Sequence, residues 1–269
     1  MALLEVSFKS NALDLASRMI LLFPEYGTPP FPVFYLLHGL SGDCTSWTRR
    51  TSLERYIGGT TAGAKTPPVP LIVAMPETGR FWYTNAASHP PGGYLGLYED
   101  HIIKDVLPFV DRTFPTIATR EGRAIGGLSM GGYGAVKLGL KYPHLFASVT
   151  SHSGAVMTPL HRWTQRQEDA RRLEAEFKSI FGENWKGGDN DPAALAEKCP
   201  PTLRPAIRLD CGTEDFLLDQ NRDLHAHLTK LGFPHEYAEF PGEHNWTYWD
   251  EHIQEAIAFH KKALHLADA

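Results

Sequence analysis

Ser129 lies in the stretch AIGGLSMGGYGAV, residues 124–136, where five glycines accompany one serine. Residues 127–131 match the pattern G-x-S-x-G, which places a serine on a sharp turn between a strand and a helix. The apolar run before the motif and the helical run YGAVKLGLKY after it fit such a turn. Glycines allow the tight approach, and a helix N-terminus favours developing negative charge. The motif predicts that Ser129 is a nucleophile. A phosphate-binding turn is disfavoured, because neither G-x-G-x-x-G nor G-x-x-x-x-G-K-[ST] is present.

A serine nucleophile needs a general base, and the base needs an acid that orients it. On a sheet of this kind the acid and then the histidine follow the serine along the chain, each after a strand. The run AIRLDCGTEDFLLD places Asp210 inside a strand and both Glu214 and Asp215 just beyond its end. We predict Asp215 as the acid, with Glu214 as the alternative, although either carboxylate could serve only to stabilise the start of the next helix.

His244 is the histidine whose position suits a general base. It lies in FPGEHNWTYW, the loop that leaves the last predicted strand. The other histidines after Asp215 lie on predicted helices or, in one case, at the start of that strand: His225, His227, His235, His252, His260 and His265. A lone histidine is more often a capping or surface residue, but the order of serine and acid favours His244 as the base.

Two backbone N–H groups usually bind the oxyanion that forms when a serine attacks a carbonyl. The residue after the nucleophile, Met130, is expected to supply one of them. Leu40, in the glycine-rich loop HGLSG after the run VFYLLHG, is expected to supply the other. His38 precedes this loop, and we interpret it as a buried, hydrogen-bonded structural residue.

Several aromatic residues fall in the loops predicted to surround the site: Trp47, Phe81, Trp82, Tyr83 and Tyr94. Trp47, Trp82 and Tyr83 are predicted to line a substrate pocket. The alternative, that these rings pack in the core beneath long loops, fits the sequence equally well.

The elements that must position these residues follow from short apolar runs that alternate with helical patterns. Two opening strands, LLEVSF and SRMILLF, precede six further runs at residues 33–39, 70–76, 122–129, 145–154, 206–212 and 235–242. Runs that are apolar on both faces favour buried parallel strands. Pro108 is expected to kink a helix or begin a new one, and Gly232 to end one. The alternation predicts an α/β fold with a mostly parallel central sheet and helices on both faces.

Residues 155–200 are long for a connection and carry a charged helical pattern. We predict a helical insertion, or cap, over the edge of the sheet, within a single domain that spans residues 1–269.

Composition excludes several classes of partner. The net charge is −5, the charged residues make up 21% of the chain, and no long basic run occurs, so nucleic acid and anionic membranes are not expected partners. Three widely spaced cysteines argue against a disulfide framework. The N-terminus resembles a strand rather than a signal peptide, and no apolar run is long enough to span a bilayer. A cytoplasmic protein is expected, and self-association into a homo-oligomer is compatible with the sequence.

With these residues described, the chain resembles the putative-esterase (esterase D-like) family of α/β hydrolases. That family includes tributyrin esterases, some feruloyl and acetyl-xylan esterases, S-formylglutathione hydrolases and mycolyltransferases. The blocks that resemble the tributyrin esterase branch are VFYLLHGLSGDCTSWTRRTSLERY, FWYTNA, GGLSMGGYGAVKLGLKYP, SGA, CGTEDFL and FPGEHNWTYWDEHI, in that order. The resemblance implies an α/β-hydrolase fold in which Ser129 is the nucleophile, Asp215 the acid and His244 the base. It also implies Leu40 and Met130 as oxyanion donors.

The activity that the resemblance implies is that of a serine carboxylesterase. It would hydrolyse short-chain acyl esters, of the tributyrin or p-nitrophenyl acetate type, through an acyl-enzyme and without cofactor or metal. An S-formylglutathione hydrolase is the main alternative, because esterase D members carry a cysteine near the oxyanion loop, where Cys44 lies. An acyltransferase and a non-catalytic binding protein on the same fold are further alternatives.

Overall fold

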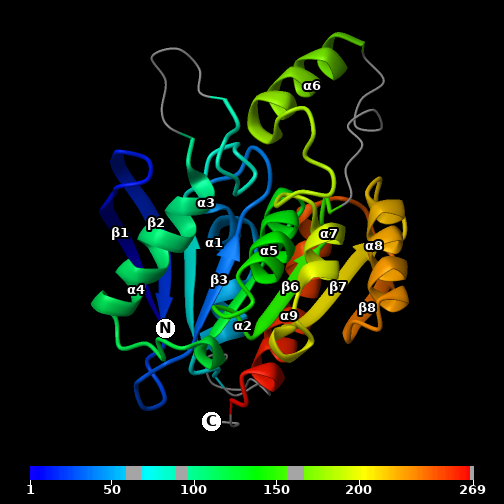
Figure 1. The fold of residues 1–269 in the computed structure, drawn as a ribbon. Helices are drawn as coiled ribbons and strands as arrows, with labels where there is room; N and C mark the ends of the chain where they lie inside the picture. Colours follow the sequence, from blue (N-terminus) through cyan, green and yellow to red (C-terminus); the bar gives the residue numbers. More distant parts are fainter. Residues whose placement is uncertain (59–67, 89–95, 157–166, 267–269) are drawn as a thin grey trace.

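The computed structural model of the protein describes residues 1–58, 68–88, 96–156 and 167–266. Eight strands form one sheet in the order β1-β2-β4-β3-β5-β6-β7-β8 (Figure 1). Their bounds are β1 Ala2–Ser10, β2 Leu15–Phe23, β3 Val33–Leu37, β4 Ile72–Pro76, β5 Arg123–Leu128, β6 Ser148–His152, β7 Ala206–Gly212 and β8 His235–Phe240. All eight predicted strands are therefore confirmed.

The sheet is mostly parallel. β1 pairs with β2 and β2 with β4 in antiparallel orientation, whereas β4, β3, β5, β6, β7 and β8 run parallel to one another. Since the parallel strands all point the same way, the loops at their carboxyl ends gather at one edge of the sheet. The sheet thus brings together the loops that follow β3, β5, β7 and β8.

The central strands are buried on both faces. In β3, Val33, Tyr35 and Leu37 join one hydrophobic cluster, while Phe34 and Leu36 join the cluster on the opposite face. Successive side chains of a strand point to opposite faces, so each core needs its own layer of helices.

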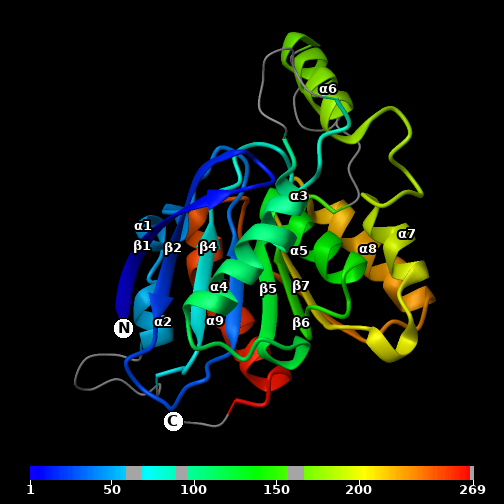
Figure 2. The same cartoon turned by 60° about the vertical axis from the view of Figure 1, so that its left-hand side comes forward.

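Helices cover both faces, as predicted (Figure 2). On one face lie α4, α5 and α8, whose apolar side chains pack with Tyr35, and on the other lie α1, α2 and α9, whose side chains pack with Phe34. Their bounds are α1 Ser46–Arg50, α2 Leu53–Gly58, α4 Leu107–Thr113, α5 Met130–Lys141, α8 Leu218–Lys230 and α9 Trp246–Ala263. The short α3 spans Tyr98–Asp100.

Two helix boundaries follow the predicted signals. A π-helical segment, His101–Val106, gives way to α4 one residue before Pro108, so the proline does begin a new segment. After α8, Gly232 has φ +58°, the left-handed conformation that glycine adopts without a Cβ penalty.

The segment predicted as an insertion contains α6, Gln167–Phe181, and α7, Pro192–Lys198; its residues 157–166 lie outside the described part. α6 lies above the carboxyl edge of the sheet (Figure 1). Arg80, in the loop after β4, contacts Glu176 of α6 through two hydrogen bonds of 3.0 and 3.1 Å. Trp82 packs against Phe177 and Phe181 of the same helix. α6 is therefore attached to the loop that follows β4.

Within the described residues, no helix combines the length and apolar character needed to cross a bilayer.

Candidate active site

Ser129 occupies the turn between β5 and α5 in a strained backbone conformation, φ +53° and ψ −115°. Its N–H donates to the carbonyl of His152 at 2.9 Å, and its own carbonyl accepts from Ala155 N–H at 3.1 Å. A Cβ at Gly127 or Gly131 would lie 2.6 or 2.5 Å from the carbonyl oxygen of Leu37. Both glycines are thus required for the close approach of the turn to β3, and the strained turn exposes the serine hydroxyl at the tip.

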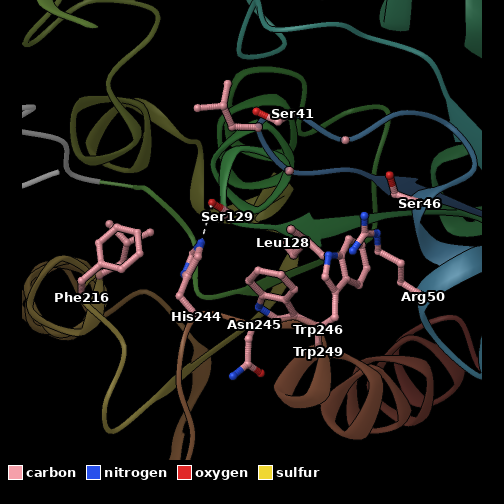
Figure 3. A pocket seen from close by; sticks show the side chains of 14 residues that line it. Ser41, Ser46, Arg50, Leu128, Ser129, Phe216, His244, Asn245, Trp246 and Trp249 are labelled. Atoms are coloured by element: carbon pink, nitrogen blue, oxygen red, sulfur yellow. Dashed lines mark hydrogen bonds between the residues drawn. The ribbon is translucent and has the colours of Figure 1, made fainter. Parts of the chain in front are cut away.

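His244 points toward this hydroxyl (Figure 3), and Asp215 lies on the other side of the imidazole. Nε2 of His244 is 3.0 Å from Oγ of Ser129, and Nδ1 is 2.8 Å from Oδ2 of Asp215. When Nδ1–H donates to the carboxylate, Nε2 carries the lone pair and can accept the serine proton. The Asp215 side chain is fully buried and that of His244 is 17% exposed, so only the reacting end of the array is open to substrate.

Glu214, the alternative acid, points elsewhere. Its carboxylate is exposed and accepts hydrogen bonds from Thr213 Oγ1 at 2.8 Å and from Gly242 N–H at 2.6 Å. The second oxygen of Asp215 accepts from Leu217 N–H at 2.8 Å, which fixes that carboxylate at the start of the segment leading into α8. The structure therefore brings Asp215, and not Glu214, into contact with His244.

Asp210, inside β7 as predicted, belongs to a separate buried cluster. It lies 2.9 Å from Nδ1 of His152 and accepts from Tyr248 Oη at 3.0 Å. This cluster joins β6, β7 and α9 beneath the site and leaves the Ser129 hydroxyl untouched.

The loop after β3 lies against the serine. A Cβ added to Gly39 would be 3.6 Å from Ser129 Cβ, and Leu40 lines the cavity in front of the hydroxyl. Met130 begins α5 directly after the serine. Within the described part of the chain, neither the Leu40 nor the Met130 N–H donates to a protein acceptor. Two unpaired donors beside a nucleophile are what an oxyanion hole requires.

His38 anchors this loop from below. Its Nδ1 donates to the Gly39 carbonyl at 2.8 Å, and its Nε2 accepts from Thr78 Oγ1 at 3.0 Å. Burial lowers the pKa of His38, so the ring is neutral and fixed in one tautomer. The structure therefore gives His38 the structural position predicted from its place before the loop.

The three aromatic residues predicted to line the pocket are core residues. Trp47, Trp82 and Tyr83 are at most 3% exposed, and none of them borders the cavity beside Ser129. Trp47 Nε1 donates to the Leu37 carbonyl at 3.1 Å, and Tyr83 Oη donates to the His38 carbonyl at 2.8 Å. Trp47 thus holds the end of β3 and Tyr83 the start of the loop that follows it. Of the other two aromatics, Phe81 packs half-buried against the core and Tyr94 lies outside the described residues.

The cavity in front of Ser129 has a volume of about 480 Å³. Its aromatic wall comes from three residues that were not predicted to line a pocket: Phe216, Trp246 and Trp249. Phe216 is 57% exposed, and its ring lies 4.6 Å from the His244 ring. Trp249 meets His244 edge-on at 4.9 Å. The available signal was that Phe216 directly follows Asp215 and that both tryptophans follow His244 within five residues.

Cys44 lies near the oxyanion loop in sequence but does not border the cavity. Its side chain is buried, which raises the thiol pKa to about 11 and keeps it protonated. Within the described ranges, no three histidine, cysteine or carboxylate side chains are grouped to hold a metal ion.

Known proteins resemble this chain over most of its length. The family model described as "Putative esterase" matches residues 10–260. An acetyl esterase of Caldicellulosiruptor saccharolyticus is 27% identical over 97% of this chain and 99% of its own. Esterase Rv1288 of Mycobacterium tuberculosis is 31% identical over 88% of this chain, which spans only 54% of that relative.

Solved structures of serine hydrolases are also similar to this chain over most of its length. The substrate-bound fluorophosphonate-binding serine hydrolase F (FphF) of Staphylococcus aureus superposes with a TM-score of 0.81 at 27% identity, over 96% of this chain and 98% of its own. The S-formylglutathione hydrolase FrmB of the same organism gives a TM-score of 0.78 at 27% identity and the same coverage.

Proposed function

This chain belongs to the Putative esterase family of α/β hydrolases, and from that premise we propose that it hydrolyses short-chain acyl esters with Ser129 as nucleophile. The protein is a serine hydrolase of carboxylic esters. The single observation that supports the assignment of residues is the hydrogen-bonded array of Ser129, His244 and Asp215 at the open end of the cavity.

In the proposed mechanism, His244 Nε2 takes the Ser129 proton as Oγ attacks the ester carbonyl. Asp215 keeps the imidazole in the correct tautomer and stabilises the imidazolium that forms. His244 then returns the proton to the leaving alcohol. A water molecule, deprotonated by the same nitrogen, hydrolyses the acyl-enzyme and restores the serine.

The N–H groups of Leu40 and Met130 are proposed to bind the oxyanion. Their freedom from protein acceptors supports this role, as does the position of Leu40 beside the hydroxyl. Removing one such donor typically raises the barrier by about 3 kcal/mol.

The test is Ser129→Ala, assayed with p-nitrophenyl acetate and with a fluorophosphonate probe. The variant is expected to fold normally, to lose roughly a million-fold in kcat and to resist labelling. The matched control is Ser88→Ala, in an exposed loop away from the cavity, which is expected to keep wild-type activity and labelling. Hydrolysis that survives Ser129→Ala in a folded protein would contradict the assignment.

Thioester hydrolysis of S-formylglutathione is the second candidate, because the FrmB structure covers 96% of the chain. The cysteine argument for it is weakened by the buried, protonated state of Cys44 outside the cavity. Comparing kcat/KM on S-formylglutathione and on p-nitrophenyl acetate distinguishes the two activities.

We further propose that residues 1–269 act as one domain with 155–200 as its cap, and that the enzyme works in the cytoplasm on a small-molecule ester. The continuous eight-stranded sheet and the contacts of α6 with the loop after β4 support the first statement. Three unpaired buried cysteines, Cys44, Cys199 and Cys211, support the second. Limited proteolysis tests the single domain, and cell fractionation tests the cytoplasmic location.

A further inference from the structure

Arg50 borders the cavity that holds Ser129. It is the last residue of α1, and its side chain is exposed. Of the described residues that line this cavity, Arg50 alone carries a permanent formal charge; His244 is the other titratable group, and no carboxylate is among them. Within the described part of the chain, the Arg50 guanidinium forms no ion pair.

Aromatic rings connect Arg50 to the reacting end of the site. Its guanidinium lies over the indole of Trp246, 5.7 Å from the ring centroid, an arrangement that holds a planar cation in place. Trp246 meets Trp249 edge-on at 5.2 Å, and Trp249 meets His244 edge-on at 4.9 Å. Figure 3 shows the two indoles between Arg50 and His244. The cavity therefore has an apolar wall with a cation at one end and the serine at the other.

Two carboxylates lie close by but outside the cavity. Asp250 and Glu251 border a separate hollow on the other side of Arg50 and Trp246. One oxygen of Asp250 accepts from Ser52 N–H at 2.6 Å, which fixes that carboxylate at the start of α2. The guanidinium thus keeps donors available toward the cavity, where the other polar side chains among the described lining residues carry hydroxyl, amide, imidazole and indole groups.

We propose that Arg50 makes this enzyme selective for esters that carry a carboxylate at the end remote from the scissile bond. The proposal rests on the ester hydrolysis proposed above and adds the substrate class. A guanidinium binds a carboxylate through two parallel N–H donors, and the Trp246 indole beneath it holds the guanidinium plane in position. The carboxylate can belong to the leaving alcohol or to the acyl group, and the experiment separates these sources.

The experiment measures kcat/KM on two pairs of substrates of matched shape. In the first pair, 4-acetoxybenzoate carries the carboxylate on the leaving phenol and 4-acetoxybenzamide is its neutral counterpart. In the second pair, mono-4-nitrophenyl adipate carries it on the acyl group and 4-nitrophenyl hexanoate is neutral. The wild type is compared with Arg50→Gln, with Arg50→Lys, and with Arg49→Gln, a neighbouring exposed arginine that does not border the cavity.

Arg50→Gln is expected to lower kcat/KM on the carboxylate substrate of at least one pair by about three- to tenfold, the range of a solvent-accessible ion pair. Its kcat/KM on both neutral substrates should change by less than twofold. Arg50→Lys should restore part of the loss, and 0.5 M salt should weaken the wild-type preference. Arg49→Gln should behave as wild type.

Equal losses on charged and neutral substrates, or no loss on either carboxylate substrate, would overturn the proposal. Those outcomes differ from failure of ester hydrolysis itself, in which the wild type would turn over none of the four substrates.

Discussion

At the scale of residues, Asp215 and Glu214 show why neighbours of identical charge are not equivalent. Asp215 is fully buried and touches the imidazole, whereas Glu214 is exposed and ties its own loop to Gly242. A buried carboxylate that accepts from an imidazole holds the tautomer that the reaction needs.

Asp215→Asn is therefore expected to lower kcat by about 10³- to 10⁴-fold, because an amide can donate to Nδ1 and so favour the wrong tautomer. Steady-state kinetics on p-nitrophenyl acetate measures this. Glu214→Gln is the matched control and should retain kcat within about threefold. The reverse pattern would make Glu214 the acid.

The triad candidates could be predicted from sequence because each follows an apolar strand that is recognisable on its own. The residues that form the wall of the cavity could not be predicted in this way. Trp47 and Tyr83 fall near the site along the chain, but they donate to the carbonyls of Leu37, at the end of β3, and His38, just after it. Trp246 and Trp249 match a helix stripe, yet they border the cavity. Spacing along the chain gives the element, whereas the direction of a side chain in a loop depends on partners far away in sequence.

At the scale of elements, the loop after β3 depends on the loop after β4. Tyr83 Oη donates to the His38 carbonyl, and the Tyr83 carbonyl accepts from Nζ of Lys137 in α5 at 2.7 Å. Lys137 is fully buried and also pairs with Glu99 at 2.6 Å. Although burial raises the pKa of Glu99, Lys137, Lys141 and Tyr142 lower it to about 2, so the carboxylate stays charged. Hydrogen bonds of Tyr83 therefore connect α5 to the loop after β3.

Tyr83→Phe is expected to lower kcat about tenfold with KM within twofold, since the oxyanion donors lose a support but the cavity wall stays intact. The Tm should fall by a few degrees only, because one hydrogen bond is lost. The control is Tyr237→Phe, which removes a hydroxyl bonded to Glu239 in β8, far along the sheet from the loop after β3. A proportional rise in KM without a change in kcat would argue against loop positioning.

At the scale of the whole molecule, buried histidines join the helices to the sheet. His260 of α9 hydrogen-bonds to Ser148 Oγ at 2.7 Å and to Thr150 Oγ1 at 3.0 Å, both in β6. Burial and then the charge of His152 lower the pKa of His260 to about 3. In the unfolded chain the imidazole titrates near its ordinary value of 6.5. Between these values the unfolded state binds a proton that the folded state excludes, so stability falls as pH decreases below about 6.5.

The free energy of unfolding should therefore fall between pH 7.5 and 5.5 by about 1.4 kcal/mol from His260 alone. Burial lowers the pKa of His101 to about 4, so this histidine also decreases the free energy of unfolding as the pH falls. Urea titrations at both pH values measure the change. His260→Gln should be less stable at pH 7.5 but should lose less on acidification, whereas His144→Gln, at an exposed position, should keep the wild-type slope. An unaltered slope in His260→Gln would show that this histidine is not the group that titrates.

The fold class and the six parallel strands could be predicted because each strand is an apolar run of its own. The antiparallel pairing of β2 with β4 could not, since Met19–Leu22 and Val73–Pro76 meet only once the sheet has assembled. The attachment of α6 to Arg80 could not be predicted either, because it depends on a contact between residues 96 positions apart.

The order of the three site residues along the chain is also the order in which they are synthesised. The ribosome makes Ser129 and its glycine turn first, then Asp215, and His244 only 115 residues after the serine. Since a domain generally folds as a unit, and one continuous sheet carries all three residues, the strained turn at Ser129 and the base that activates it are expected to form together, after β8 and the loop with His244 have been made.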